Sequence, residues 1–194
     1  MNAPGIGHNR GPAMDDGVSW RRHCWTVARA ELLPHLPLEV IRGRVKRARE
    51  IGLDYRTYAS VRATTGRDIV AFLFSSNALR VIRAEDQLPE DRAARLREIR
   101  ACRRALLAQP PHDAERLAEA IAERHGIRFD GAGPAPGFAR PWREVREGVL
   151  AALPARVAPG AVLLIGDAPG ERDWYEAARL GGYLPAGRYF AAGS

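Results

Sequence analysis

The fold class rests on residues 162–182, which read Val-Leu-Leu-Ile-Gly-Asp-Ala-Pro-Gly-Glu-Arg-Asp-Trp-Tyr-Glu-Ala-Ala-Arg-Leu-Gly-Gly. The stretch opens with a short apolar run, continues through a Gly/Pro loop and ends with helical spacing. Such a strand–loop–helix unit is the building block of parallel sheets. Two carboxylates, Asp167 and Glu171, follow the strand directly. In open α/β sheets, ligands and metals bind at the carboxyl ends of the strands.

A second apolar run, from Ile69 to Phe74, has the length of a strand and is apolar on both faces. It suits a buried strand, and a buried helix is the alternative. Most of the remaining chain has helical periodicity. The sequence therefore predicts a mostly α protein with a small parallel β element, an α/β fold. Helices are expected at Ser19–Leu33, 38–51, 54–64, Ala78–Ile82, 90–108, Ala114–His125, 142–153 and Glu171–Leu180.

Composition along the chain predicts three regions and a linker. Residues 1–17 are rich in Gly, Pro, Asn and Asp and are expected to form a disordered leader. A mainly helical region, residues 18–129, follows it. The Gly/Pro-rich stretch 130–141 is expected to link that region to a C-terminal helix–strand–helix unit, residues 142–194.

The overall composition indicates a globular protein, with 46% hydrophobic and 27% charged residues among 194. No apolar run approaches the ~20 residues that a membrane-spanning helix needs, and the N-terminus lacks a signal-peptide core. We therefore expect a cytoplasmic protein with no membrane partner. Cys24 and Cys102 belong to no metal-spaced or redox pair, and both are expected to be free thiols.

The residues around Gly52 have the spacing of two short helices joined by a tight turn. Ala48 supplies a small residue where the second helix crosses the first, and Gly52 can leave the first helix in a left-handed conformation. Asp54 stands at the N-cap position of the second helix. Tyr58 and Val61, three residues apart, would give that helix its buried stripe. This spacing fits a helix-turn-helix, and an ordinary helical corner is the alternative.

Residues 44–64 resemble the helix-turn-helix of bacterial DNA-binding proteins through the pattern Ala-x3-Gly-Leu-Asp-x2-Thr-Tyr-x2-Val. One departure is Arg47, where the family more often has an apolar residue. From Leu36 to Arg67, eight basic residues against three acidic ones give +5 of the chain's net charge of +7, and such arginine-rich helices attract phosphate. The resemblance implies a DNA-binding accessory or regulatory protein. Its base-reading or positioning residues would be Arg56, Thr57, Ser60 and Arg62, and its phosphate-holding residues Arg42, Arg44, Lys46, Arg47 and Arg49.

The unit at residues 162–182 resembles the last motif of haloacid-dehalogenase-like phosphatases, in which Gly-Asp and a second acid follow a strand. The resemblance implies that Asp167 and Glu171 would lie on the Mg²⁺ side of a site. The family's Asp-x-Asp nucleophile is missing, because the comparable strand leads into Ser75-Ser76-Asn77. The family's phosphate-stabilising lysine is missing too, since the sole lysine, Lys46, lies in the basic helix. We therefore expect no phosphoryl transfer, no catalytic residue and no required cofactor.

Two readings of the function follow, and a purely structural or interaction protein is a third. The first is DNA binding, with homodimerisation or a protein partner left open because the chain has no coiled-coil heptad. The second is a degenerate haloacid-dehalogenase-like protein that binds a phosphorylated ligand or a protein partner. Parallel, adjacent strands at 69–74 and 161–165 would favour the second. An octapeptide, Gly5-Ile-Gly-His-Asn-Arg-Gly-Pro12, is similar to a leader of alphaproteobacterial proteins, some of them phage-related.

Overall fold

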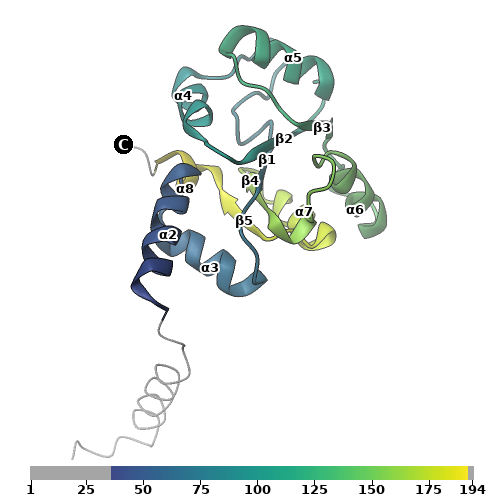
Figure 1. Cartoon of the computed structure of the whole chain (residues 1–194). Coiled ribbons are helices and arrows are strands. Elements are labelled where there is room, and N and C mark those ends of the chain that lie inside the picture. Colours follow the sequence, from purple (N-terminus) through teal and green to yellow (C-terminus); the bar gives the residue numbers. More distant parts are fainter. Residues whose placement is uncertain (1–35, 192–194) are drawn as a thin grey trace, which may run out of the picture. The chain divides into compact units, whose positions relative to one another are not determined.

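The computed structural model describes residues 36–191 and divides the chain into two compact units between Val40 and Ile41. In the described part of the first unit, the Val40 N–H donates to the Pro37 carbonyl (2.9 Å) where helix α2 (Leu38–Glu50) begins. The second unit holds every other described element (Figure 1). The expected leader at 1–17 and the expected helix at Ser19–Leu33 lie outside the described residues.

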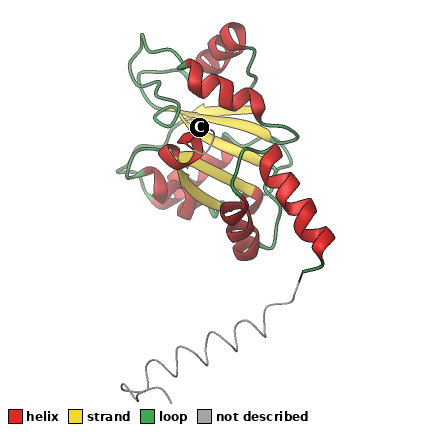
Figure 2. Ribbon diagram, turned by 90° about the vertical axis from the view of Figure 1, so that its left-hand side faces the viewer, coloured by secondary structure: helices red, strands yellow, loops and turns green. Residues whose placement is uncertain are grey.

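Five short strands of the second unit form one parallel sheet, in the order β3-β2-β1-β4-β5. Helices lie on both sides of it (Figure 2). The chain winds outward from β1 to β3, returns to place β4 beside β1, and continues to β5. At this reversal the carboxyl ends of β1 and β4 lie side by side, the usual ligand position in doubly wound sheets, and we call the region just beyond these two ends the crevice. The strands are β1 (Ala71–Ser75), β2 (Arg103–Ala108), β3 (Gly131–Pro134), β4 (Val162–Gly166) and β5 (Gly182–Pro185).

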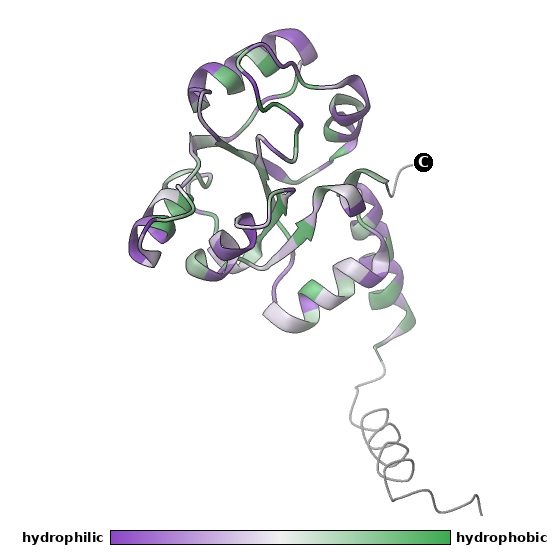
Figure 3. Cartoon of the chain, turned by 180° about the vertical axis from the view of Figure 1, so that it is seen from behind, coloured by the Kyte–Doolittle hydropathy of each residue, from purple (hydrophilic) through white to green (hydrophobic). Residues whose placement is uncertain are grey.

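The strands bury side chains on both faces, so the molecule has two cores. Phe72 and Phe74 of β1 belong to one core, which α2, α3, α4, α5 and α8 cover. Ala71 and Leu73 belong to the other, which α6 and α7 cover. Two-sided burial explains the unbroken apolar runs of β1 and β4, and Figure 3 shows hydrophobic colouring on the strands. The helices are α3 (Tyr55–Thr65), α4 (Glu90–Glu98), α5 (Ala114–His125), α6 (Trp142–Ala151), α7 (Glu171–Ala178) and α8 (Ala186–Ala191).

The expected α/β class is therefore confirmed, and Ile69–Phe74 contributes a strand. The expected helix at 90–108 is wrong in its second half, because α4 ends at Glu98 and residues 103–108 form β2. Ala101 adopts a left-handed conformation (φ 50°) and interrupts the helical path. Alanine and leucine favour helices, but the Ala105–Ala108 run is buried on both faces between β1 and β3, and burial outweighs that preference.

The stretch 130–141, expected as a linker, contains β3. Its glycines permit close packing against the end of α6: a Cβ on Gly131 would lie 2.4 Å from the Ala152 carbonyl oxygen, and one on Gly133 would lie 2.9 Å from the Ala152 Cβ. Glycine there serves close approach within the sheet layer. The C-terminal strands β4 and β5 consequently belong to the same sheet as β1 and β2.

The short helix expected at Ala78–Ile82 is also wrong, because this segment is a turn. The Leu79 N–H bonds to the Ser75 carbonyl (3.1 Å) and the Arg80 N–H to the Asn77 carbonyl (2.9 Å). None of the helices within residues 36–191 combines the length and the apolar character that crossing a membrane requires.

Candidate functional site

The crevice between β1 and β4 is closed by the carboxylate of Glu171, whose residue is fully buried at the start of α7. Its Oε2 accepts hydrogen bonds from the Ser75 hydroxyl (2.9 Å) and from the N–H groups of Asp167 (2.7 Å) and Ala168 (3.2 Å). Its Oε1 accepts from the Asn77 side-chain amide (2.8 Å). We call this arrangement the Glu171 lock. Four donors from two loops thus converge on one buried anion.

The sequence around the lock explains its geometry. Ser75 ends β1, and its oxygen also accepts the Ala78 N–H (3.0 Å), which holds the following turn. Gly166 ends β4, and a Cβ there would lie 2.6 Å from both Glu171 Oε2 and Tyr183 Cε2. Glycine at this position is therefore what lets the carboxylate reach the crevice. Burial, followed by the charges of Glu171 and Asp167, raises the pKa of Tyr183.

The hydroxyl of Ser76 joins a third strand to this edge of the sheet. Its oxygen accepts the Gln109 N–H (3.0 Å) just beyond β2, while the Ser76 N–H donates to the Leu107 carbonyl (2.9 Å). Ser75, Ser76, Asp167 and Glu171 therefore lie at the same edge of the sheet. Asp167 is exposed to solvent, whereas the other three residues are buried.

The donor set of the crevice does not fit Mg²⁺. Magnesium prefers carboxylates together with waters or phosphates, in near-octahedral geometry. Glu171 is the only buried acid here, and its lone pairs are directed at N–H and O–H donors of the chain. Ser75 and Asn77 stand where two further acids would be needed. Between residues 36 and 191, no three His, Cys, Asp or Glu side chains gather as metal ligands.

A buried arginine beside this edge escaped the sequence analysis. Arg92 of α4 is only 4% exposed; its Nη1 donates to the Ala78 carbonyl, and its guanidinium lies 4.1 Å from the centre of the Phe190 ring. Burial, followed by the charge of Arg80, lowers the pKa of Arg92. Its Nε is buried without a partner among the described residues. Asn77 was also missed, and its position two residues after Ser75 was the available signal.

The two helices and the turn expected around Gly52 are present as α2, the turn and α3. Gly52 is left-handed (φ 70°), and Ala48 and Ile51 are fully buried beside it. Asp54 caps α3, accepting the Thr57 N–H (2.8 Å) and the Thr57 hydroxyl (2.6 Å). These residues join the core that covers one face of the sheet. The corner therefore packs in the helical layer that covers this face of the sheet.

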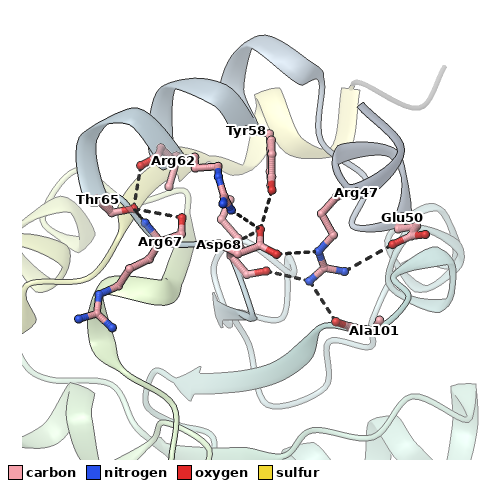
Figure 4. Close-up of polar contacts among 10 residues, drawn as sticks. Arg47, Glu50, Tyr58, Arg62, Thr65, Arg67, Asp68 and Ala101 are labelled. Atoms are coloured by element: carbon pink, nitrogen blue, oxygen red, sulfur yellow. Dashed lines mark hydrogen bonds and ion pairs between the residues drawn. The ribbon is translucent and has the colours of Figure 1, made fainter. Parts of the chain in front are cut away.

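Asp68, in the loop before β1, ties this corner to the sheet (Figure 4). Its carboxylate accepts the Tyr58 hydroxyl (2.7 Å) and the Arg47 Nε–H (3.3 Å), and lies 3.8 Å from Arg62. Arg47 also donates to the carbonyls of Ile69 (2.9 Å) and Ala101 (3.1 Å). Burial, followed by the hydrogen bond to Asp68, raises the pKa of Tyr58.

The nine predicted DNA-contacting residues therefore divide into three sets. Arg47, Thr57 and Arg62 direct their polar atoms at the chain itself, and the Thr57 hydroxyl also accepts from Arg188 (3.0 Å). Arg44 is half-buried, with its Nε buried. The residues exposed to solvent are Arg42, Lys46, Arg49, Arg56 and Ser60.

The strand order and the crevice at the reversal define the class: a doubly wound, parallel α/β protein. Comparisons with protein-family models, with curated proteins and with solved structures find no match to this chain.

Proposed function

We propose that this chain is a non-catalytic, DNA-binding accessory or regulatory protein with a doubly wound α/β fold. The observation that carries DNA binding is the basic face of α2. Arg42, Lys46 and Arg49 are exposed and line one open hollow on the outside of that helix, with Ile41 and Val45 between them. Three cations on one helix face can pair with successive phosphates and release their counterions.

The Glu171 lock supports the absence of phosphoryl transfer. The N–H groups of Asp167 and Ala168 would be the natural donors to a phosphate at this crevice, but Glu171 Oε2 already accepts from both. A phosphate entering there would find both N–H groups already bonded to the Glu171 side chain. Neither Ser75 nor Asn77 can supply a carboxylate nucleophile. The crevice is a structural clamp in this proposal.

The test is fluorescence-anisotropy binding to a mixed-sequence duplex across a salt series. We expect tight binding at low salt that weakens as salt rises, and a loss of affinity in Arg42→Gln/Lys46→Gln. An absence of binding at low salt would refute the DNA proposal. Turnover of a simple phosphomonoester with Mg²⁺, abolished by Glu171→Gln, would refute the non-catalytic part.

A second candidate is protein binding at the carboxyl edge of the sheet. Phe138 and Trp142 are each 58% exposed, and they line a hollow of about 40 Å³ together with Arg140 and Trp174. Phe138 stacks on the buried Trp174 ring (5.7 Å between centres, 6° between planes). Exposed aromatic residues beside arginine are typical of protein interfaces, and this hollow is far smaller than the ~300–1,000 Å³ of small-molecule sites. Loss of a co-purifying partner in Phe138→Asp, with DNA binding unchanged, would favour this candidate.

A further inference from the structure

The amino edge of the sheet, opposite the Glu171 lock, carries a row of arginines. All five strands are parallel and therefore begin at this one edge. One exposed arginine stands three to six residues before the first residue of each strand. We call these five the edge arginines: Arg67 before β1, Arg100 before β2, Arg128 before β3, Arg156 before β4 and Arg179 before β5.

The strand order places the edge arginines in one row, and contacts join the segments that carry three of them. The Arg100 N–H donates to the Glu50 carbonyl (2.8 Å) at the end of α2, and Arg103 Nη1 donates to the Ala155 carbonyl (2.8 Å), next to Arg156. The stem of Arg67 lies against Gly160: a Cβ on that glycine would be 3.7 Å from Arg67 Cδ. With strands ~4.8 Å apart, four intervals give a row roughly 19 Å wide.

Within the described chain, no hydrogen bond or ion pair engages the guanidinium group of any edge arginine; the Thr65 hydroxyl bonds Arg67 only at its backbone (3.1 and 3.3 Å). Other arginines differ: Arg104, for example, donates to the carbonyls of Leu96 (2.8 Å) and Ile99 (2.9 Å). Figure 4 shows the Arg67 guanidinium pointing away from the Asp68 network. The fold thus uses some arginines internally and presents these five to solvent.

Acids at the same edge are already engaged by the chain. Asp68 accepts from Tyr58 and Arg47, and Glu50 lies 3.7 Å from Arg47. Asp130 accepts the Arg104 N–H (2.9 Å). These contacts tie the three acids to the chain beside the row of exposed arginines.

Two of the edge arginines occupy backbone conformations that favour glycine. Arg156 has φ 65°, and Arg179 has φ 53° as the C-cap of α7. Residues with a Cβ adopt this left-handed region at a cost that glycine avoids. Arginine is therefore the less stable choice there, which a requirement for charge at this edge would offset.

We propose that the edge arginines bind the phosphate backbone of duplex DNA. A row of roughly 19 Å spans about five to six nucleotide steps at 3.4 Å per step of one strand, so several phosphates lie within reach. Membrane-surface binding usually adds apolar side chains, and among the large apolar side chains exposed from Ile41 onward only Val70 lies at this edge. The inference rests on DNA binding as the function, and it adds the amino edge to the basic face of α2 as a phosphate-contacting surface.

The test compares three full-length variants that each remove three positive charges. The edge variant is Arg67→Gln/Arg100→Gln/Arg156→Gln. It removes the edge-arginine charge before each of three neighbouring strands, β1, β2 and β4. The helix variant is Arg42→Gln/Lys46→Gln/Arg56→Gln. The opposite-edge variant is Arg80→Gln/Arg83→Gln/Arg172→Gln. Binding to a 20-base-pair mixed-sequence duplex is measured by anisotropy between 50 and 300 mM salt, with thermal unfolding as the folding check.

We expect the edge variant to lose about 10²-fold in affinity near 0.1 M salt, and its log–log salt slope to fall by about 3, because each lost phosphate contact removes ~0.9. The opposite-edge variant should lose less than about five-fold. Equal losses in these two variants, or a loss confined to the helix variant, would overturn the inference and leave DNA binding standing. If the wild-type chain binds anionic vesicles and no DNA, the function and the inference both fail.

The backbone strain provides a second readout. Replacing Arg179 or Arg156 by glycine should raise the unfolding temperature by about 1–3 °C, since glycine relieves the left-handed conformation, while DNA affinity falls roughly five- to ten-fold per substitution. A lower unfolding temperature with unchanged affinity would mean that these arginines serve the helix ends, and would overturn the inference.

Discussion

Removing the carboxylate of Glu171 should destabilise the protein strongly and leave the charged side chains on its surface unchanged, because Glu171 is fully buried. Glu171→Ala deprives four donors of their acceptor: the Ser75 hydroxyl, the Asn77 amide and the N–H groups of Asp167 and Ala168. Asn77 is half-buried and can turn to water, whereas the Ser75 residue is fully buried. Each buried donor left unpaired costs ~1–3 kcal/mol. If two of the four donors stay unpaired, their cost together with that of the cavity left by the side chain lowers the unfolding free energy by about 3–5 kcal/mol.

The measurement is urea unfolding by circular dichroism, with linear extrapolation to water. For a domain of this size the loss corresponds to a fall of roughly 6–20 °C in unfolding temperature. Glu171→Gln keeps an oxygen for the donors and should cost only about 1–2 kcal/mol. The matched control is Glu176→Ala on the exposed face of α7, where the partner Arg172 is 3.9 Å away and the change should stay within ~0.5 kcal/mol. If Glu171→Ala matched Glu176→Ala, the lock would contribute nothing, and the reasoning would be refuted.

Three further predictions concern the corner and the thiol. Arg47→Ala should lower the unfolding free energy by about 2–3 kcal/mol, because Arg47 bonds two carbonyls, while exposed Arg49→Ala stays within ~0.5 kcal/mol; equal effects in urea unfolding would contradict the internal role of Arg47. Asp54→Ala should cost about 0.5–2 kcal/mol at pH 7 as a lost N-cap. Burial by itself raises the pKa of Asp54, but the hydrogen bonds from Thr57 outweigh burial, so the net effect is a lowered pKa. The cost of Asp54→Ala should therefore be full above pH ~4 and vanish as pH falls through the pKa of Asp54 in the folded protein. A cost that stays constant down to about pH 2 would argue against this role of the carboxylate. Burial raises the pKa of Cys102 to about 12, so in a Cys24→Ser background its reaction with a disulfide reagent at pH 8 should be at least ~10²-fold slower in the folded than in the urea-unfolded protein, and comparable rates would refute the burial of this thiol.

Local patterns in the sequence were sufficient for most elements and for the corner at Gly52. Interactions between residues a few positions apart produce the Gly52 turn, the Asp54 cap and the burial of Ala48. The spacing of residues in the sequence predicts such interactions directly. Helix Ala114–His125 is likewise delimited by its own caps, Asp113 and Gly126. The strands at 69–74 and 161–165 were recognisable because two-sided burial leaves an unbroken apolar run.

The sequence alone determined the α/β class, the corner and the strand–loop–helix unit, because each follows from contacts that are short in sequence. Only the tertiary structure decided that 103–108 is a strand, since its environment is made by β1 and β3, far away along the chain. The same holds for Glu171, whose donors Ser75 and Asn77 stand 96 and 94 residues away. Long-range packing also decided which arginines are free: Arg47 turns inward to Asp68, while Arg67, Arg100 and Arg156 are brought to one edge by the parallel sheet.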